Sequence, residues 1–142
     1  KQPISITYNV SCPSNIGGTL EYQTTVSAVG AGGVLAGCAG GVSGTVEFDD
    51  QGGGVYEISD ITFGQYDCAW GDTPAVGVSL VDICGSLTLT GGDQYGLIYS
   101  ISIVSNDGTE LVIDWENDYG DMGRTILKRT DGQPWPLNLS TN

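Results

Sequence analysis

Apolar and polar residues alternate along most of the chain, and this two-residue period constrains the fold more than any other feature. In residues 20–26, for example, Leu20, Tyr22 and Val26 fall on one face while Glu21 and Gln23 fall on the other. Such alternation is typical of a half-buried β-strand. An apolar pattern of helical period does not continue for three turns anywhere. The chain is therefore predicted to be all-β.

Turn residues separate the alternating segments and predict a single domain of about nine or ten strands. Asn106-Asp107-Gly108 is the strongest hairpin signal, and the run DDQGGG at 49–54 predicts another hairpin. The prolines of 131–140 exclude a central strand, so Trp135 is expected to pack there as a lid. Strands are predicted at 4–10, 20–26, 45–48, 55–58, 76–83, 86–90, 95–105, 110–116 and 124–129.

Sequential strands joined by short turns favour an antiparallel meander, either closed into a lipocalin-like barrel or folded as a Greek-key sandwich. The barrel is favoured because closure removes exposed sheet edges and needs only hairpin connections. The sandwich stays open as an alternative because the glycine-rich stretch at 29–44, predicted to be a flexible loop, could serve as its long crossing connection.

Four cysteines and no histidine indicate disulfides rather than a zinc site, and hence an exported protein. The cysteines are Cys12, Cys38, Cys68 and Cys84, and their three possible pairings stay open. The shortest loops would come from Cys12 with Cys38 and from Cys68 with Cys84, which would pin the loop 66–84 to the sheet.

The net charge of -13 argues against nucleic acid as a partner, and the scattered carboxylates, including Asp60, are expected to be solvated.

Large aromatic side chains in or beside predicted loops are the candidate binding residues. They are Tyr66, Trp70, Tyr95 and Tyr119. Sugar rings present C–H faces that stack on aromatic rings, while carboxylates accept hydrogen bonds from their hydroxyl groups. We expect a glycan site if these four side chains meet, and a small satellite core beneath a loop is the alternative.

Catalytic and metal-binding residues are harder to find. Without histidine, Ser-His-Asp and Cys-His machinery is absent, and disulfides would consume the thiols. Asp114 and Glu116 could form the carboxylate pair of a glycosidase, but the polar side of a strand is the favoured interpretation. Asp118 and Asp121 are weak candidates for Ca²⁺ because the spacing of an EF-hand is missing. We expect no catalytic residues, no metal and no cofactor.

The chain also resembles small surface-exposed lipoproteins of Bacteroidota over about residues 56–136. The resemblance lies in YEISDITFG at 56–64, CAWGD at 68–72, VDIC at 81–84, LVIDW at 111–115, YGD at 119–121 and TDGQPW at 130–135. It implies an exported β-rich domain that a lipid attaches to the outer membrane, in some cases beside polysaccharide-uptake machinery. It also implies a framework role for Cys68, Cys84 and the turn between them.

The expected function is that of a non-enzymatic surface module. It would bind glycan through the loop aromatics, or dock as an accessory subunit on an outer-membrane assembly, without a membrane-spanning segment of its own. The alternative is a structural subunit of an extracellular polymer, in which strand 4–10 adds to the sheet of a neighbouring subunit.

Overall fold

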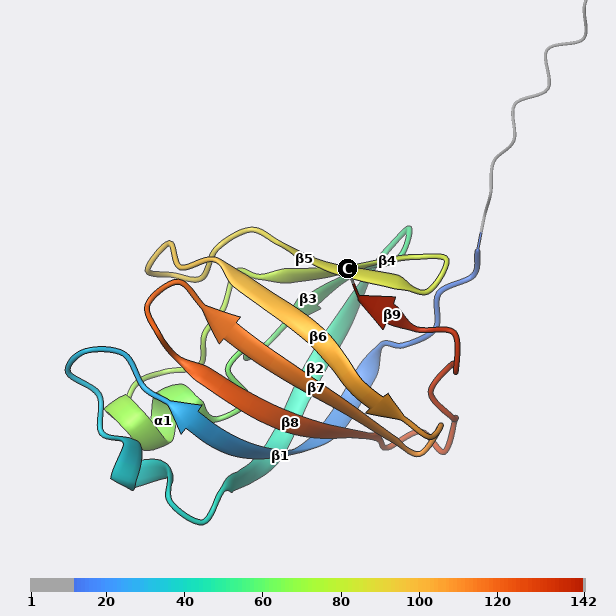
Figure 1. Ribbon diagram of the computed structural model, residues 1–142. Coiled ribbons are helices and arrows are strands. Elements are labelled where there is room, and N and C mark those ends of the chain that lie inside the picture. Colours follow the sequence, from blue (N-terminus) through green and yellow to red (C-terminus); the bar gives the residue numbers. More distant parts are fainter. Residues whose placement is uncertain (1–11, 142) are drawn as a thin grey trace, which may run out of the picture.

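The computed structural model describes residues 12–141 and has a single nine-stranded sheet that is nearly closed into a barrel (Figure 1). The all-β prediction and the preference for a barrel over a sandwich are thus confirmed. The strands are β1 (Gly18–Ala28), β2 (Val42–Gly52), β3 (Val55–Ile58), β4 (Ser79–Ile83), β5 (Ser86–Thr90), β6 (Tyr99–Asn106), β7 (Glu110–Asn117), β8 (Met122–Arg129) and β9 (Ser140–Thr141).

Eight strands form an up-and-down meander. Antiparallel pairing joins β1 to β2, β2 to β3, β3 to β4 and β4 to β5, and likewise β6 to β7 and β7 to β8, and β8 returns to pair with β1. The two-residue strand β9 fills the seam between β5 and β6. It pairs parallel with β5, and Thr141 Oγ1 accepts a hydrogen bond of 3.0 Å from the Ile103 amide of β6. The sequence predicted no strand at β9, which is too short to show alternation.

Side chains of the inner faces fill the barrel and leave a cavity of only about 10 Å³. Strand alternation points Leu20, Phe48, Leu80, Ile113 and Leu127 inward, each at most 4% exposed. Trp135 closes one end as expected: it is 1% exposed, and its indole Nε1 donates to the Leu127 carbonyl at 3.1 Å. The interior is therefore a solid core, and any ligand site has to lie outside it.

Several predicted boundaries differ from the observed ones. The strand predicted at 76–83 begins only at Ser79. The strand predicted at 95–105 begins only at Tyr99, because residues 91–98 form turns held by Asp93. The glycine-rich stretch 29–44 is not one loop: it contains the 3₁₀ helix η1 (Leu35–Cys38) and the start of β2. The strand predicted at 4–10 lies outside the described residues.

A short helix, α1 (Gln65–Trp70), occupies the segment expected to be an irregular loop, and that expectation is wrong. Six residues are too few to display a helical period.

The disulfides also differ from the shortest-loop pairing, because they join Cys12 to Cys84 and Cys38 to Cys68. No bridge therefore closes 66–84 on itself. Two disulfides place the chain in an oxidising compartment.

Part of the expected surface charge is in fact buried. The side chains of Asp60, Asp82, Asp93 and Asp121 are 9%, 9%, 7% and 1% exposed. Each one accepts hydrogen bonds from neighbouring amide or hydroxyl groups, so it is hydrogen-bonded without an ion pair. Sequence spacing cannot show this burial, because an isolated Asp in a turn looks the same whether its turn faces inward or outward.

Within residues 12–141, no helix combines the length and the apolar character that a membrane crossing needs.

Candidate functional site

One pocket of about 450 Å³ lies at the barrel end opposite Trp135, and we call it the aromatic pocket. Its lining consists of Tyr66, Trp70, Asp72, Tyr95, Leu97, Tyr119 and Asp121. The four aromatic residues singled out in the sequence thus lie together, although they come from three separate segments: α1, the β5–β6 connection and the β7–β8 turn. The loops of this end gather around α1 on the left of Figure 1.

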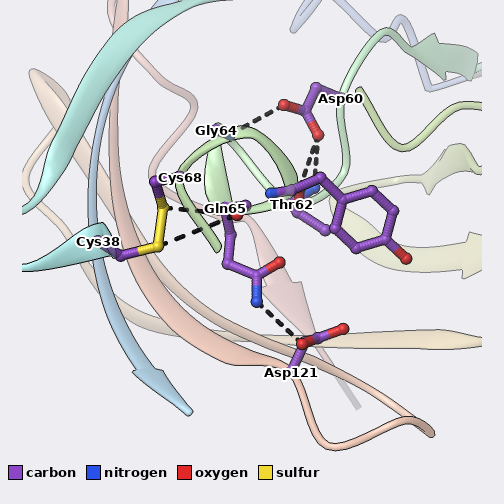
Figure 2. The surroundings of a disulfide bond; sticks show 8 residues. Cys38, Asp60, Thr62, Gly64, Gln65, Cys68 and Asp121 are labelled. Atoms are coloured by element: carbon purple, nitrogen blue, oxygen red, sulfur yellow. Dashed lines mark hydrogen bonds between the residues drawn. A yellow bond between two sulfur atoms is a disulfide. The ribbon is translucent and has the colours of Figure 1, made fainter. Parts of the chain in front are cut away.

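The α1 helix carries two of the four aromatic walls, and a buried carboxylate shapes its start. Asp60 accepts hydrogen bonds from the amides of Thr62 and Gly64, at 3.0 and 2.9 Å, which folds the chain into the first turn of the helix (Figure 2). Phe63 takes a left-handed conformation (φ 47°) between these two donors. Gly71 ends the helix in the same conformation (φ 61°) and donates to the Asp67 carbonyl at 2.8 Å.

The disulfide between Cys38 and Cys68 fastens the β1–β2 loop to α1 (Figure 2). A backbone hydrogen bond of 2.9 Å from Val34 to Ala69 adds to this connection. Gly33 lies against the indole of Trp70 so closely that a Cβ there would be 2.7 Å from the ring atom Cε2. Trp70 is thus held from behind by the loop, and its other side lines the pocket.

The inner wall of the pocket rests on a hydroxyl and carboxylate cluster. Tyr66 is 4% exposed, and its hydroxyl donates to Asp93 Oδ2 at 2.5 Å. The hydroxyl of Tyr99 donates to the same oxygen at 2.7 Å. Burial raises the pKa of both phenols, and bonding to Asp93 raises the pKa of Tyr66 further. Both phenols are therefore neutral at physiological pH, and Tyr66 is fixed in place.

The outer rim is exposed and aromatic. Tyr95 and Tyr119 are 59% and 47% exposed. Tyr95 is inclined at 52° to Tyr66 with the ring centroids 6.1 Å apart, and Tyr119 is inclined at 48° to Trp70 with the centroids 6.0 Å apart. Two pairs of tilted rings thus face the pocket, which presents several aromatic surfaces at different angles.

Two carboxylates complete the lining. Asp72 lies at the rim and accepts a hydrogen bond from the Tyr95 hydroxyl, which lowers the pKa of Asp72 and raises that of Tyr95. Asp121 lies at the base, where Oδ1 accepts from the Gly30 amide at 2.8 Å and from Gln65 Nε2 at 2.9 Å (Figure 2). Its other oxygen accepts from Asn117 Nδ2 at 2.8 Å. The sequence did not single out Asp72, Leu97 or Gln65, because a polar turn residue or a lone Leu carries no signal.

The surroundings of the pocket contain two unpaired buried polar atoms. Within residues 12–141, Gln65 Oε1 and Trp70 Nε1 are the buried side-chain atoms without a hydrogen-bond partner. Buried polar groups are nearly always paired in folded proteins. Gln65 is bonded to the pocket residue Asp121, and Trp70 itself lines the pocket. This end of the barrel is therefore the part of the described structure where polar groups are least well satisfied.

The basic side chains of residues 12–141 all lie in ion pairs away from the pocket. These pairs are Arg124 with Asp114, Lys128 with Glu110, and Arg129 with Asp131. None of the three basic residues lines the aromatic pocket. The pocket is accordingly bordered by carboxylates without a neighbouring cationic side chain.

The carboxylates considered for a glycosidase lie elsewhere. Asp114 and Glu116 line a shallow groove of about 820 Å³ on the outer face of β1, β6, β7 and β8. Arg124 binds Asp114 through two hydrogen bonds of 2.7 and 3.1 Å and lowers its pKa. A glycosidase needs one carboxyl group with a raised pKa, so the effect on Asp114 is in the opposite direction.

The two weak calcium candidates do not act as a pair. Asp121 is held by the three hydrogen bonds described above, whereas Asp118 accepts a bond from the Ile98 amide at 3.2 Å. Among residues 12–141, no three His, Cys, Asp or Glu side chains are grouped so that they could hold a metal ion.

Comparison of the chain with protein-family models, with curated proteins and with solved structures found no match.

Proposed function

We propose that the protein is a non-enzymatic, exported surface module that binds glycan in the aromatic pocket, as an accessory subunit of an outer-membrane assembly. The observation that carries the proposal is the meeting of Tyr66, Trp70, Tyr95 and Tyr119 around one pocket. Its volume of about 450 Å³ falls within the roughly 300–1,000 Å³ typical of small-ligand sites. The disulfides support export.

The build of the pocket suits a sugar ring. The partly exposed ring of Trp70 is held in place by the β1–β2 loop, so stacking on it would cost little side-chain entropy. The buried ring of Tyr66, fixed by Asp93, supports the exposed ring of Tyr95 from below. Asp72 at the rim has a half-buried side chain whose carboxylate can accept hydrogen bonds from sugar hydroxyl groups. A ring that stacks on aromatic faces and bonds at its edges fits this combination.

A glycan array with the wild-type protein and the Trp70→Ala variant tests the proposal. We expect several oligosaccharides to bind the wild type and about tenfold weaker binding to the variant, since an aromatic contact contributes on the order of 1 kcal/mol beyond the area that it buries. Glu116→Gln, in the outer groove, is the control and should bind like the wild type. If no glycan binds the wild type, the proposal is wrong.

A second function, assembly by strand addition, is favoured by the seam of the barrel. Strand β6 pairs with β7 on one side, whereas its other side lies beside β5 and the two-residue β9 without pairing with a strand of the described sheet. An added strand could pair with this edge, and the alternating segment 4–10 is a suitable donor. Light scattering after size exclusion tests the idea: assemblies should form with the full chain and disappear when residues 1–11 are removed. A monomer at every concentration would exclude it.

A further inference from the structure

We propose that the aromatic pocket selects a ligand with a positively charged ammonium group and, given the proposed glycan function on which this inference rests, that the ligand is an amino sugar with a free amine. Three properties of the pocket carry the inference: the type of its rings, the carboxylates that border it, and the absence of a basic side chain from its lining.

The rings provide the first part of the argument. The π face of Trp or Tyr carries partial negative charge and attracts a cation whose centre lies within about 6 Å of the ring centroid. Several rings set at angles to one another can surround a single ammonium group. In this protein four such rings line one pocket, in two pairs whose planes are inclined at 52° (Tyr66 with Tyr95) and 48° (Trp70 with Tyr119).

The carboxylates provide the second part. Asp121 is 1% exposed at the base of the pocket, and its hydrogen-bond donors are the neutral groups of Gly30, Gln65 and Asn117. Asp93 is 7% exposed behind Tyr66, and its donors are likewise hydroxyl and amide groups. Neutral donors solvate a carboxylate without cancelling its charge. Asp72 adds a half-buried carboxylate at the rim, and its bond from Tyr95 lowers its pKa and keeps it ionised.

The third part is the lack of a basic side chain that would neutralise these carboxylates. The lining contains no Lys or Arg, and the three basic residues of 12–141 are each paired with a carboxylate elsewhere. The net charge of -13 adds a negative field over the whole molecule. An acidic or sulfated sugar would be repelled from such a pocket, whereas an ammonium group would be attracted both by the field and by the rings.

Calorimetric titration with two matched disaccharides tests the inference: the β-1,4-linked dimer of glucosamine and its N-acetylated form, which has the same rings but no charge. Choline serves as a third probe with an ammonium group and no sugar. We expect the glucosamine dimer to bind at least about tenfold more tightly than the acetylated dimer. Equal or tighter binding of the acetylated dimer would overturn the inference and leave the glycan function intact.

The other outcomes separate the two proposals. Binding of choline without binding of either sugar would support selection of an ammonium group but overturn the assignment of the ligand as an amino sugar. If none of the three probes bound, the inference would be overturned, and the glycan array would then decide the proposed function independently.

Two charge-removing variants distinguish binding in the pocket from a general attraction of the cationic ligand to an acidic protein. Asp72→Asn removes one charge at the rim, and Glu116→Gln removes one in the outer groove. We expect Asp72→Asn to weaken binding of the glucosamine dimer severalfold and Glu116→Gln to leave it unchanged. Equal weakening by both variants would mean that net charge alone attracts the ligand, and this would overturn the inference. Asp72 is chosen over Asp121 because its side chain is only half-buried, whereas Asp121 is 1% exposed, so its replacement should disturb folding less.

Discussion

The hydroxyl of Tyr66 lies 2.5 Å from Oδ2 of Asp93, and this hydrogen bond joins α1 to the β5–β6 connection beneath the aromatic pocket. Asp93 also accepts bonds from the amides of Tyr95 and Leu97, at 2.9 and 3.0 Å. A single buried carboxylate therefore organises both the inner wall of the pocket and the segment that carries its rim.

Replacing Tyr66 with Phe should destabilise the protein by about 1–3 kcal/mol, because a buried carboxylate loses one of its donors while the ring stays in place. Urea denaturation measures the change. The control is Tyr119→Phe, which removes an exposed hydroxyl bound to the Ala31 carbonyl and should cost less than about 1 kcal/mol. Equal losses in the two variants would contradict the role assigned to Asp93.

Stability should decline as the pH rises above about 10, the ordinary pKa of tyrosine. Burial raises the pKa of Tyr66 and Tyr99 in the folded protein, so the unfolded chain releases their protons first. The unfolded state then binds fewer protons, which lowers the free energy of unfolding as the pH increases. Urea midpoints measured between about pH 8 and pH 11 should show this decline, and Tyr66→Phe should make it shallower. An identical slope in the variant would argue against the pKa shift.

The two disulfides should differ in their effect on binding. Replacing Cys38 and Cys68 by Ser should lower the free energy of unfolding by about 3.5 kcal/mol, because this bridge joins residues 30 positions apart. Replacing Cys12 and Cys84 by Ser should lower it by about 4.5 kcal/mol, because their separation is 72 residues. Only loss of Cys38–Cys68 should also weaken ligand binding, since Cys68 lies between Tyr66 and Trp70 on α1. Calorimetric titration of both double variants, at a temperature where both are folded, measures this difference. Equal weakening in both would contradict a local effect.

Trp135→Ala should destabilise the barrel by about 3–5 kcal/mol, because it empties a large buried site. The Arg129 guanidinium also lies over the Trp135 ring, 5.5 Å from its centroid, so the variant loses this cation–π contact too. Binding in the aromatic pocket should be unchanged below the new melting temperature, since the pocket lies at the opposite end. Thermal denaturation and ligand titration of the same sample test both statements. A loss of affinity would show that the two ends are coupled.

The sequence predicted the strands because alternation is a local property, and the barrel is favoured over the sandwich because hairpins suffice to close it. Leu111, Ile113 and Trp115 share a face whatever strand lies beside them, and Asn106-Asp107-Gly108 marks its own turn. The four pocket aromatics could be found for a related reason: a large aromatic ring in a predicted turn is unusual enough to stand out. That they form a binding site stays a prediction.

The parts that could not be predicted depend on contacts between distant residues. The Cα atoms of Cys38 and Cys68 lie 5.0 Å apart only because η1 is folded onto α1, and no spacing rule selects that pair. The burial of Asp93 and Asp121 follows in the same way from donors far away in the chain, such as Tyr66 and Gly30. Helix α1 was missed because its six residues are set by the Asp60 turn and by Gly71 rather than by periodicity.

The filled interior has a consequence for how this protein could change. In a hollow barrel, altering the ligand means repacking the core, and each new specificity puts folding at risk. Here the proposed recognition surface lies outside the core, and its exposed rim is carried by turns at one end of the barrel. Tyr95 and Tyr119, both exposed, could therefore be exchanged with little effect on the barrel. The architecture is suited to diversification, both by natural selection and by library design, in the way that antibody loops vary over a constant framework.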